Sequence, residues 1–260
     1  MTRVLVCGAL GRMGQQICNA VGEADDLELV GGADVMADGA CTTGQGVSVL
    51  PSLEQALDEL SPDVVVDFTR PDAAEANVRL ALSRGVHVVL GTTGLSEEKL
   101  AEIYEQAATG GAHLFHAPNF TTGAVLMMLF SAQAAKYFPD AEVIELHHDG
   151  KKDAPSGTAI RTARMIAAAR DSVSGAPGKE TEIDGCEGAR GALVDGVPVH
   201  SVRTAGYVAH QEVIFGSMGQ TLTIRHDSID RSSYMPGVLL AIRSVADIDG
   251  LLVGLENIMD

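Results

Sequence analysis

The feature that most constrains this chain is the alternation of short apolar runs with amphipathic stretches over residues 3–119. The runs are continuous and end in glycine, proline or small polar residues, which predicts parallel strands buried on both faces. The stretches between them have helical spacing, so we expect helices on both faces of one sheet. The predicted strands are 3–8, 27–34, 63–69, 86–94 and 112–119, and the predicted helices are 12–23, 52–60, 73–85 and 96–110.

The pattern changes after about residue 119, where strands begin to follow one another without intervening helices, which favours a mixed or antiparallel sheet. The chain is therefore predicted to be α/β, with a parallel-sheet domain and a smaller α+β domain with a mixed sheet. We assign residues 1–118 and 229–260 to the first domain and residues 119–228 to the second. In the second half we expect helices at 121–137, 157–170 and 235–248 and strands at 141–148, 197–203, 207–216 and 220–227.

Two segments show neither the helical spacing nor the strand pattern of apolar residues. Residues 33–49 are rich in Gly, Thr and Ala and are predicted to form a loop with little structure. Residues 171–196 are Gly-rich and charged and are predicted to form a loop or a lid.

The charge balance excludes some classes of partner. The formal net charge is -17, so we expect no nucleic-acid and no membrane partner, because both need a basic surface. The four cysteines have no CxxC spacing, and a disulfide framework is not expected in a chain of this size. The apolar run before the first glycine is too short for a signal peptide or a span. We expect a cytoplasmic protein.

A glycine loop follows the first predicted strand. "GALGRMG" places Gly8, Gly11 and Gly14 at the start of the first predicted helix, where a dinucleotide pyrophosphate can approach only a turn without side chains. The spacing is GxxGxxG rather than GxGxxG, and the alternative is a turn that uses glycine for packing. Asp34 ends the second strand, where a ribose hydroxyl needs an acceptor.

Arg12 and Asp34 give opposing signals about the coenzyme. Arg12 can contact a phosphate, including the 2′-phosphate of NADP, or it is simply a solvated residue of the first turn. Asp34 repels that phosphate. Together they predict NADH or NADPH as the cofactor, with NADH favoured and dual use allowed.

Small and polar residues end three further strands, in "DFTRP", "GTTG" and "APNF". In an open parallel sheet, ligands bind at the carboxyl ends of the strands. Each of these ends alone is compatible with ordinary turn chemistry, but together they predict one rim for the nicotinamide. The rim residues are Phe68, Thr69, Gly91, Thr93, Ala117, Asn119 and Phe120.

The stretch "ELHHDGKKDAPSGTA", residues 145–159, concentrates charged groups that folding alone does not require. His147 or His148 can donate a proton near neutral pH, and alternation along a strand directs them to opposite faces. Lys151 follows across a short turn. The N–H groups of Gly157 and Thr158 begin a helix and can bind a carboxylate. An acid, a cation and an anion cradle together fit reduction of a small carboxylate substrate.

The paired histidines also have an interpretation as metal ligands. His147 and His148 with Asp149 or Asp153 suggest a metal, but adjacent histidines on a strand rarely reach one ion, so no metal site is expected. Five of the six other histidines are expected to serve in packing or at the rim: His87, His113, His116, His200 and His210.

These motifs, together with "VRTAGYVAHQEVIFG" and "LTIRHDSIDRSSYMPGV", make nearly the whole chain resemble dihydrodipicolinate reductase, also called 4-hydroxy-tetrahydrodipicolinate reductase. The stretch from the paired histidines to "DAPSGTA" is specific to that family, whereas the glycine loop is not. The resemblance implies NAD(P)H-dependent reduction of 4-hydroxy-tetrahydrodipicolinate, a small cyclic dicarboxylate, to tetrahydrodipicolinate in the diaminopimelate and lysine pathway, by a homotetramer.

The resemblance also implies that residues 1–118 and 229–260 form a Rossmann-type dinucleotide-binding domain and that residues 119–228 serve in substrate binding and oligomerisation. It implies roles for single residues as well. His147 is implied as a proton donor, Lys151 as a second proton donor, and His148, Gly157 and Thr158 as substrate-binding residues. The implied cofactor-binding residues are Gly8, Ala9, Leu10, Gly11, Arg12, Met13, Asp34, Phe68, Thr69, Gly91, Thr92, Thr93, Ala117, Pro118, Asn119 and Phe120.

The chain departs from the family pattern at Gly150, where the family often has another histidine. If that histidine binds substrate, the affinity here is expected to be lower, and Asp149 adds a negative charge near a dianionic substrate. The alternatives are another two-domain NAD(P)-dependent amino-acid or sugar dehydrogenase, which leaves the "DAPSGTA" cradle unexplained, and a non-catalytic NAD-sensing regulator, which usually carries a basic DNA-binding element.

Overall fold

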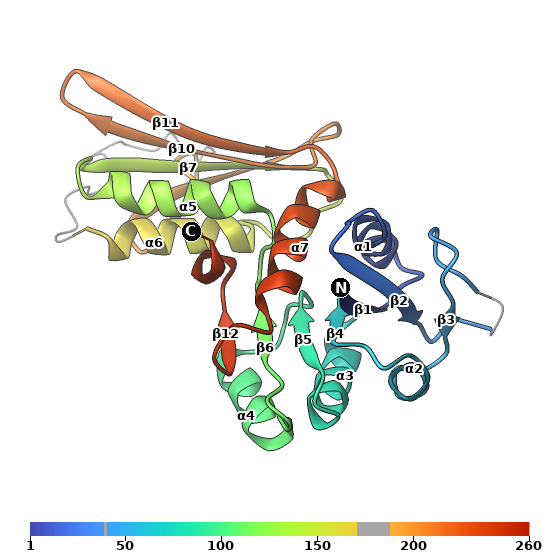
Figure 1. The fold of residues 1–260 in the computed structure, drawn as a ribbon. Coiled ribbons are helices and arrows are strands. Elements are labelled where there is room, and N and C mark those ends of the chain that lie inside the picture. Colours follow the sequence, from blue (N-terminus) through green and yellow to red (C-terminus); the bar gives the residue numbers. More distant parts are fainter. Residues whose placement is uncertain (39–40, 171–187, 260) are drawn as a thin grey trace. The chain divides into compact units, whose positions relative to one another are not determined.

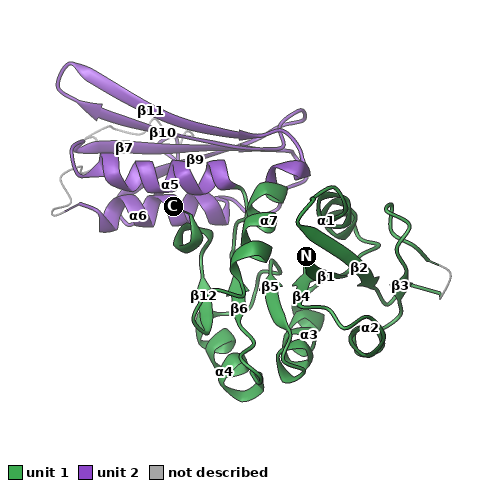
Figure 2. Cartoon of the chain, in the orientation of Figure 1, with its two compact units in different colours: residues 1–121, 234–260 green, residues 122–233 purple. Residues whose placement is uncertain are grey.

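The structure is a computed structural model that describes residues 1–38, 41–170 and 188–259. The chain divides into two compact units, one of residues Met1–Thr121 with Tyr234–Asp260 and one of residues Thr122–Ser233 (Figure 2). The domain boundaries predicted from the sequence fall a few residues earlier along the chain.

Unit 1 contains a parallel sheet with helices (Figure 1). Its described strands form seven positions in the order β12-β6-β5-β4-β1-β2-β3, and the paired strands run parallel. The strands are β1 (Thr2–Cys7), β2 (Leu27–Ala33), β3 (Val49–Leu50), β4 (Val64–Asp67), β5 (His87–Leu90), β6 (Leu114–His116) and β12 (Leu251–Val253). The helices are α1 (Arg12–Gly22), α2 (Leu53–Leu60), α3 (Pro71–Ser83), α4 (Glu97–Ala107) and α7 (Met235–Ser244), with a 3₁₀ helix at Leu255–Ile258.

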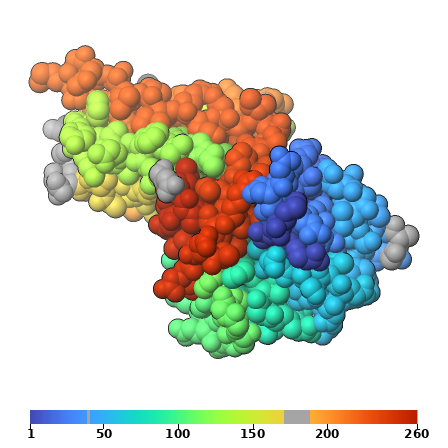
Figure 3. Space-filling model, in the orientation of Figure 1, coloured from blue at the N-terminus to red at the C-terminus, as the bar shows by residue number. Residues whose placement is uncertain are grey.

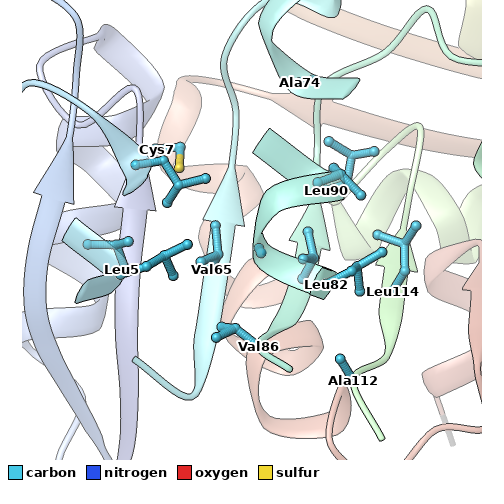
Figure 4. Packing of buried hydrophobic residues seen from close by; sticks show 14 of the residues in the cluster. Leu5, Cys7, Val65, Ala74, Leu82, Val86, Leu90, Ala112 and Leu114 are labelled. Carbon is cyan, nitrogen blue, oxygen red and sulfur yellow. The ribbon is translucent and has the colours of Figure 1, made fainter. Parts of the chain in front are cut away.

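The core of unit 1 is aliphatic. Leu5, Val65, Leu90 and Leu114 from the strands pack with residues of α2, α3 and α4, and each of the four is at most 1% exposed (Figure 4). Burying such a side chain contributes roughly 1.5–3 kcal/mol. The predicted cap of α2 is confirmed, because the Ser52 hydroxyl accepts a hydrogen bond from the Gln55 N–H at 3.2 Å.

The strand order of the sheet in unit 1 indicates where a ligand would bind. The chain runs outward from β1 to β2 and β3 on one side and from β4 to β5 and β6 on the other. The order therefore reverses between β1 and β4, and ligands of open α/β sheets bind at the carboxyl ends of strands at such a point. The predicted Rossmann-type arrangement is confirmed.

Unit 2 has a mixed sheet, as predicted, and its strands lie in the order β11-β10-β7-β9-β8. Only β7 and β9 pair in parallel among the described strand pairs of this sheet. Two helices pack together against it, and the core between them contains Val143, Ile166, Val213 and Phe215. The elements are α5 (Thr122–Ala135), β7 (Asp140–His147), α6 (Gly157–Ala168), β8 (Ala192–Val194), β9 (Val197–Arg203), β10 (Ala209–Ser217), β11 (Gln220–Ser228) and a 3₁₀ helix at Arg231–Tyr234.

Several predictions were wrong in detail. Ala192–Val194 forms β8 although it was assigned to a loop or lid, and residues 171–187 of that prediction lie outside the described residues. The segment predicted as a loop at 33–49 contains a bridge between Thr42 and Ser48 and the start of β3. The chain does not close with α7, because β12 follows it and pairs with β6, and the 3₁₀ helix at Leu255–Ile258 comes after β12. Strands β3, β8 and β12 are too short to show an alternation of apolar and polar residues. They can be recognised only from their pairing with neighbouring strands.

The end of β7 also differs from the prediction. The strand ends at His147, and His148 lies beyond it. Strand alternation therefore does not place His148, although it does place His147 and Glu145 on one face.

Candidate active site

The glycine loop joins β1 tightly to α1. Gly8 has φ +74°, a conformation that favours glycine, and a Cβ there would lie 3.2 Å from the Thr69 Cγ2. A Cβ on Gly14 would lie 2.0 Å from the Gly8 carbonyl oxygen. Both glycines are therefore required for the close approach of helix and strand. Packing alone explains Gly14, so the case for a dinucleotide depends on the groups around the loop.

The start of α1 is open to an anion. The helix begins at Arg12, and no side chain caps it at Gly11, so its first N–H groups and the positive end of its dipole are left for a ligand such as a pyrophosphate. Ala9 is buried and Arg12 is exposed. The loop thus offers backbone donors without side-chain bulk, as a pyrophosphate requires.

Asp34 follows β2 directly, as predicted, and its carboxylate lies against the loop. One oxygen accepts a hydrogen bond from the Leu10 N–H at 3.1 Å and the other from the Met36 N–H at 2.9 Å. Each carboxylate oxygen has a second lone pair, so Asp34 can also accept from a ribose hydroxyl. The residues present therefore fit an adenine dinucleotide.

Asp67, which was not predicted from the sequence, is a fully buried carboxylate at the end of β4. Its Oδ1 accepts hydrogen bonds from the Thr69 N–H at 3.0 Å, the Thr69 hydroxyl at 2.7 Å and the Thr92 hydroxyl at 3.0 Å. Its Oδ2 accepts from the Asn77 amide at 2.8 Å. Asp67 thereby connects the loop after β4 to the loop after β5. One function of the Thr69 and Thr92 hydroxyls is therefore to donate hydrogen bonds to this carboxylate.

The aromatic side of the rim is closely packed. A Cβ on Gly91 would lie 2.1 Å from the Phe68 ring, so glycine is required there. The Phe68 ring lies 5.3 Å from that of Phe120, between centroids. Ala117 donates its N–H to the Leu90 carbonyl at 3.3 Å, and the Asn119 side chain accepts from the Thr121 N–H at 2.8 Å. The strand order brings the predicted rim segments, including Thr93 and Pro118, to one edge of the sheet.

In unit 2, His147 ends β7 and its side chain is 14% exposed. Its Nδ1 is hydrogen-bonded to Oε2 of Glu145, which lies two residues earlier on the same face. A carboxylate oxygen can only accept, so the bond places a proton on Nδ1. The other ring nitrogen, Nε2, is then the atom that can exchange a proton with a ligand.

Glu145 is 0% exposed and makes several ionic and polar contacts. The guanidinium of Arg203, at the end of the neighbouring strand β9, donates to Oε2 at 2.9 Å and to Oε1 at 2.8 Å, a two-pronged pair. The Ser156 N–H donates to Oε1 at 3.2 Å. Burial alone raises the pKa of Glu145, but the hydrogen bonds from His147 and Arg203 lower it to about 2.

Lys151 lies in the turn after β7. Its N–H donates to the His148 carbonyl at 3.2 Å, and its ammonium pairs with Asp153 at 2.8 Å. The hydrogen bond from Lys151 lowers the pKa of Asp153. Arg203 also donates to the Asp153 carbonyl at 2.6 Å, which fixes the backbone of this turn.

The start of α6 has the form predicted for an anion cradle. Ser156 is the cap and accepts from the Ala159 N–H at 3.2 Å. A Cβ on Gly157 would meet no atom within 4 Å, and Gly157 is exposed. Neither packing nor backbone conformation therefore requires glycine here, and its effect is to leave the first N–H groups accessible. Thr158 is half-buried, and its carbonyl accepts from the Thr162 hydroxyl at 2.8 Å.

Sequence reasoning missed Glu145 and Arg203. The signal for Glu145 was present, because Ala141 and Val143 precede it on the buried face of an alternating strand, where an acid needs a partner. The partner was not readable from spacing, because Arg203 is brought to it only by the parallel pairing of β7 with β9, in which His147 is opposite Arg203.

The other histidines have structural contacts. His116 is buried and its Nδ1 contacts the Leu90 carbonyl at 3.0 Å. His200 pairs with Glu142 at 2.8 Å and His210 with Asp227 at 2.6 Å. Within the described residues, no group of three or more His, Cys, Asp or Glu side chains is arranged to hold a metal. The described part of the chain also has no helix long and apolar enough to cross a membrane.

Unit 1 has a parallel sheet with a glycine loop and an acid, Asp34, directly after β2. Unit 2 has a mixed sheet and presents an imidazole, a lysine and a helix N-terminus. These features define a two-unit oxidoreductase that uses a pyridine nucleotide. Comparison with known proteins is more specific. Family models for dihydrodipicolinate reductase match residues 2–120, described as its N-terminus, and residues 123–259, described as its C-terminus. The chain belongs to the dihydrodipicolinate reductase family.

Individual relatives agree over the full length. The chain is 51% identical over 259 residues to the 4-hydroxy-tetrahydrodipicolinate reductase of Mycolicibacterium vanbaalenii, with 99% of each chain covered. It is 48% identical to that of Listeria welshimeri, with 99% of this chain and 100% of the other covered. A solved structure, dipicolinate-bound dihydrodipicolinate reductase from Paenisporosarcina sp. TG-14, is 43% identical, covers 100% of both chains and has a TM-score of 0.88.

Proposed function

We propose that the protein reduces 4-hydroxy-tetrahydrodipicolinate to tetrahydrodipicolinate with NADH or NADPH, in diaminopimelate and lysine biosynthesis. The observation that carries the proposal is the unit 2 constellation of His147, Lys151 and the open start of α6, in a chain that matches the named reductases over its full length. In the reaction the substrate hydroxyl leaves as water, a hydride is added, and overall one proton is taken up. Bound NAD(P)H supplies the hydride.

Unit 2 then binds the substrate and moves protons. The N–H groups at Gly157 and Thr158 bind one carboxylate, because a helix N-terminus with unpaired donors favours an anion. His147 presents Nε2 as the proton donor, since its Nδ1 is committed to Glu145. Lys151 is the second proton donor, and its release from Asp153 frees the ammonium for a substrate carboxylate or for proton transfer. His148 is assigned to substrate binding on resemblance.

Unit 1 holds the coenzyme through the predicted residues. The N-terminus of α1 binds the pyrophosphate, Asp34 accepts from the adenosine ribose, and the loops after β4, β5 and β6 hold the nicotinamide end. We propose that NADH is favoured, because the charge of Asp34 opposes a 2′-phosphate, and that Arg12 allows NADPH to be used as well.

We propose further that the enzyme is a cytoplasmic homotetramer that assembles through unit 2. Support comes from β11, which is an edge strand with mostly exposed residues. The turn between β10 and β11, drawn in orange, lies at the surface (Figure 3), and its Met218 is 98% exposed. Exposed apolar residues next to an open strand edge favour contact with another copy. Sedimentation equilibrium tests the assembly, and a monomer at micromolar concentration would contradict it.

Dipicolinate provides a direct test of the substrate assignment. The related solved structure is described as dipicolinate-bound, and dipicolinate is a planar cyclic dicarboxylate. We expect it to bind to the wild-type protein in calorimetry and to compete with substrate in kinetics. Binding that is equal in the Gly157→Asp variant, whose carboxylate would repel the ligand, would contradict the proposed cradle.

A further inference from the structure

The proposed roles of His147 and Lys151 as proton donors do not by themselves require a carboxylate at Glu145. Its carboxylate is fully buried, and a buried charge is costly unless it is paired. Arg203 supplies that pair through both carboxylate oxygens. The pair is neutral overall, so the imidazole of His147 is not needed to compensate the charge of Glu145.

The same carboxylate contacts two parts of the proposed site. Its Oε2 holds Nδ1 of His147, and its Oε1 accepts from the N–H of Ser156, the cap of α6. Arg203 adds the third part, because it also donates to the carbonyl of Asp153 in the turn that carries Lys151. The proton donor, the lysine turn and the anion cradle are thus all attached to one ion pair.

The arrangement has a defined chemical effect on His147. A neutral imidazole can carry its proton on either nitrogen, and the hydrogen bond made by one nitrogen decides the state of the other. With Nδ1–H donating to Glu145, Nε2 of the neutral ring carries no proton and is the nitrogen that takes up the proton later given to the substrate. The ring cannot rotate without breaking a hydrogen bond to a buried carboxylate.

We propose that Glu145, held by Arg203, is a positioning residue that fixes the tautomer and the orientation of His147 and the start of α6 for catalysis. The inference rests on the proposed function for the identity of the reaction. Arg203 is required because only its planar fork meets both oxygens and the Asp153 carbonyl, and lysine cannot reproduce this geometry.

The chain offers a matched control on the same strand. Glu142 is also a carboxylate of β7 that contacts one arginine, Arg190, and one histidine, His200, but it lies on the opposite face of the strand. Glu145→Gln and Glu142→Gln therefore make the same chemical change, and only the first touches His147.

The kinetic experiment measures both variants with reduced coenzyme and substrate. We expect Glu145→Gln to lower kcat at least about 10-fold, and by no more than the roughly 10²–10⁴-fold that a positioned general acid contributes, while NADH binding measured by fluorescence is unchanged. Glu142→Gln should keep kcat within about twofold of wild type. A kcat of Glu145→Gln within twofold of wild type overturns the proposal, as does an equal loss in both variants.

The spectroscopic experiment does not depend on activity, and its first readout needs no variant of Glu145. In ¹⁵N-labelled wild-type protein, the imidazole signals of His147, identified by their loss in His147→Gln, should show one neutral tautomer with the proton on Nδ1 at high pH. Glu145→Gln should shift these nitrogen signals towards a mixture of tautomers. An Nε2–H tautomer in the wild type, or unchanged signals in the variant, overturns the proposal. Wild-type protein that fails to oxidise NADH or NADPH with substrate contradicts the proposed function and leaves this readout valid.

Discussion

The carboxylate of Asp34 accepts a hydrogen bond from the N–H of Leu10 at 3.1 Å, and this bond joins the end of β2 to the glycine loop. The acid that is proposed to select the coenzyme is therefore held by the loop that is proposed to bind the pyrophosphate. The hydrogen bonds that position its carboxylate come from backbone N–H groups, those of Leu10 and Met36.

The first prediction concerns coenzyme preference. Asp34→Asn removes the negative charge but keeps the shape and one acceptor oxygen, so we expect kcat/KM for NADPH relative to NADH to rise about tenfold, which corresponds to about 1.4 kcal/mol. Steady-state kinetics with both coenzymes measure it. Asp25→Asn, an exposed acid before the start of β2, is the control. An unchanged ratio in Asp34→Asn would remove this residue from the ribose site.

The second prediction concerns Asp67. Its carboxylate accepts from Thr69, Thr92 and Asn77 in the interior. Asp67→Asn replaces one acceptor oxygen by a donor, so buried donors lose their partner, and we expect the free energy of unfolding to fall by about 1–3 kcal/mol with weaker NADH binding. Urea unfolding and coenzyme titration measure the two effects. In contrast, Asp72→Asn removes an exposed ion pair with Arg70 and one exposed charge from the first turn of α3, and it should change stability much less. Equal stability of the two variants would argue against the proposed network.

The third prediction separates stability from function at Gly157. Because a Cβ there meets no atom within 4 Å and the residue lies in a helix, Gly157→Ala should keep or raise stability, by up to about 1 kcal/mol. The added methyl group covers the N–H groups of the cradle, so KM for the substrate should rise several-fold. Thermal unfolding and kinetics on the same preparation test both. A stable variant with unchanged KM would exclude Gly157 from carboxylate binding.

The fourth prediction concerns pH. The His87 and His113 rings stack with centroids 5.1 Å apart, and the His113 N–H donates to Nδ1 of His87 at 3.1 Å. Burial, and then the charge of His113, lower the pKa of His87, while Asp63 opposes this. The unfolded chain therefore binds a proton at a pH where folded His87 does not. The contribution of His87 is present above the unfolded value of about 6.5 and is lost as the pH falls through the lowered folded pKa.

The pH prediction is tested by urea unfolding at several pH values between 5 and 8. The wild-type free energy of unfolding should decrease as the pH falls below about 6.5, and His87→Gln should show a smaller decrease. The same decrease in both proteins would mean that other groups cause it.

The sequence predicts the strand ends of unit 1 well because continuous apolar runs and glycine turns are local features. Gly8, Asp34 and Gly91 each follow such a run, and the parallel order brings them to one edge. Strand β12 was missed because Leu251–Val253 has no period of its own and exists through its pairing with β6.

Asp67 in unit 1 and Glu145 in unit 2 are buried acids that hold neighbouring groups in place. They were not predicted, for a related reason. Asp67 appeared to be the polar end of an apolar run, and only the fold shows that Thr92 and Asn77 converge on it. Glu145 depends on Arg203, which is distant in the sequence and adjacent only through β9. The groups proposed to contact ligands follow from local motifs, whereas the groups that hold them in place depend on contacts between segments that only the fold brings together.

The most direct test of the central claim is the oxidation of NADH or NADPH, followed by absorbance at 340 nm, in the presence of the condensation product of pyruvate and aspartate semialdehyde. We predict substrate-dependent loss of absorbance with one coenzyme oxidised per substrate consumed, and a much lower turnover for His147→Ala with NADH binding retained. Absence of oxidation, or the same rate without the condensation product, would contradict the account.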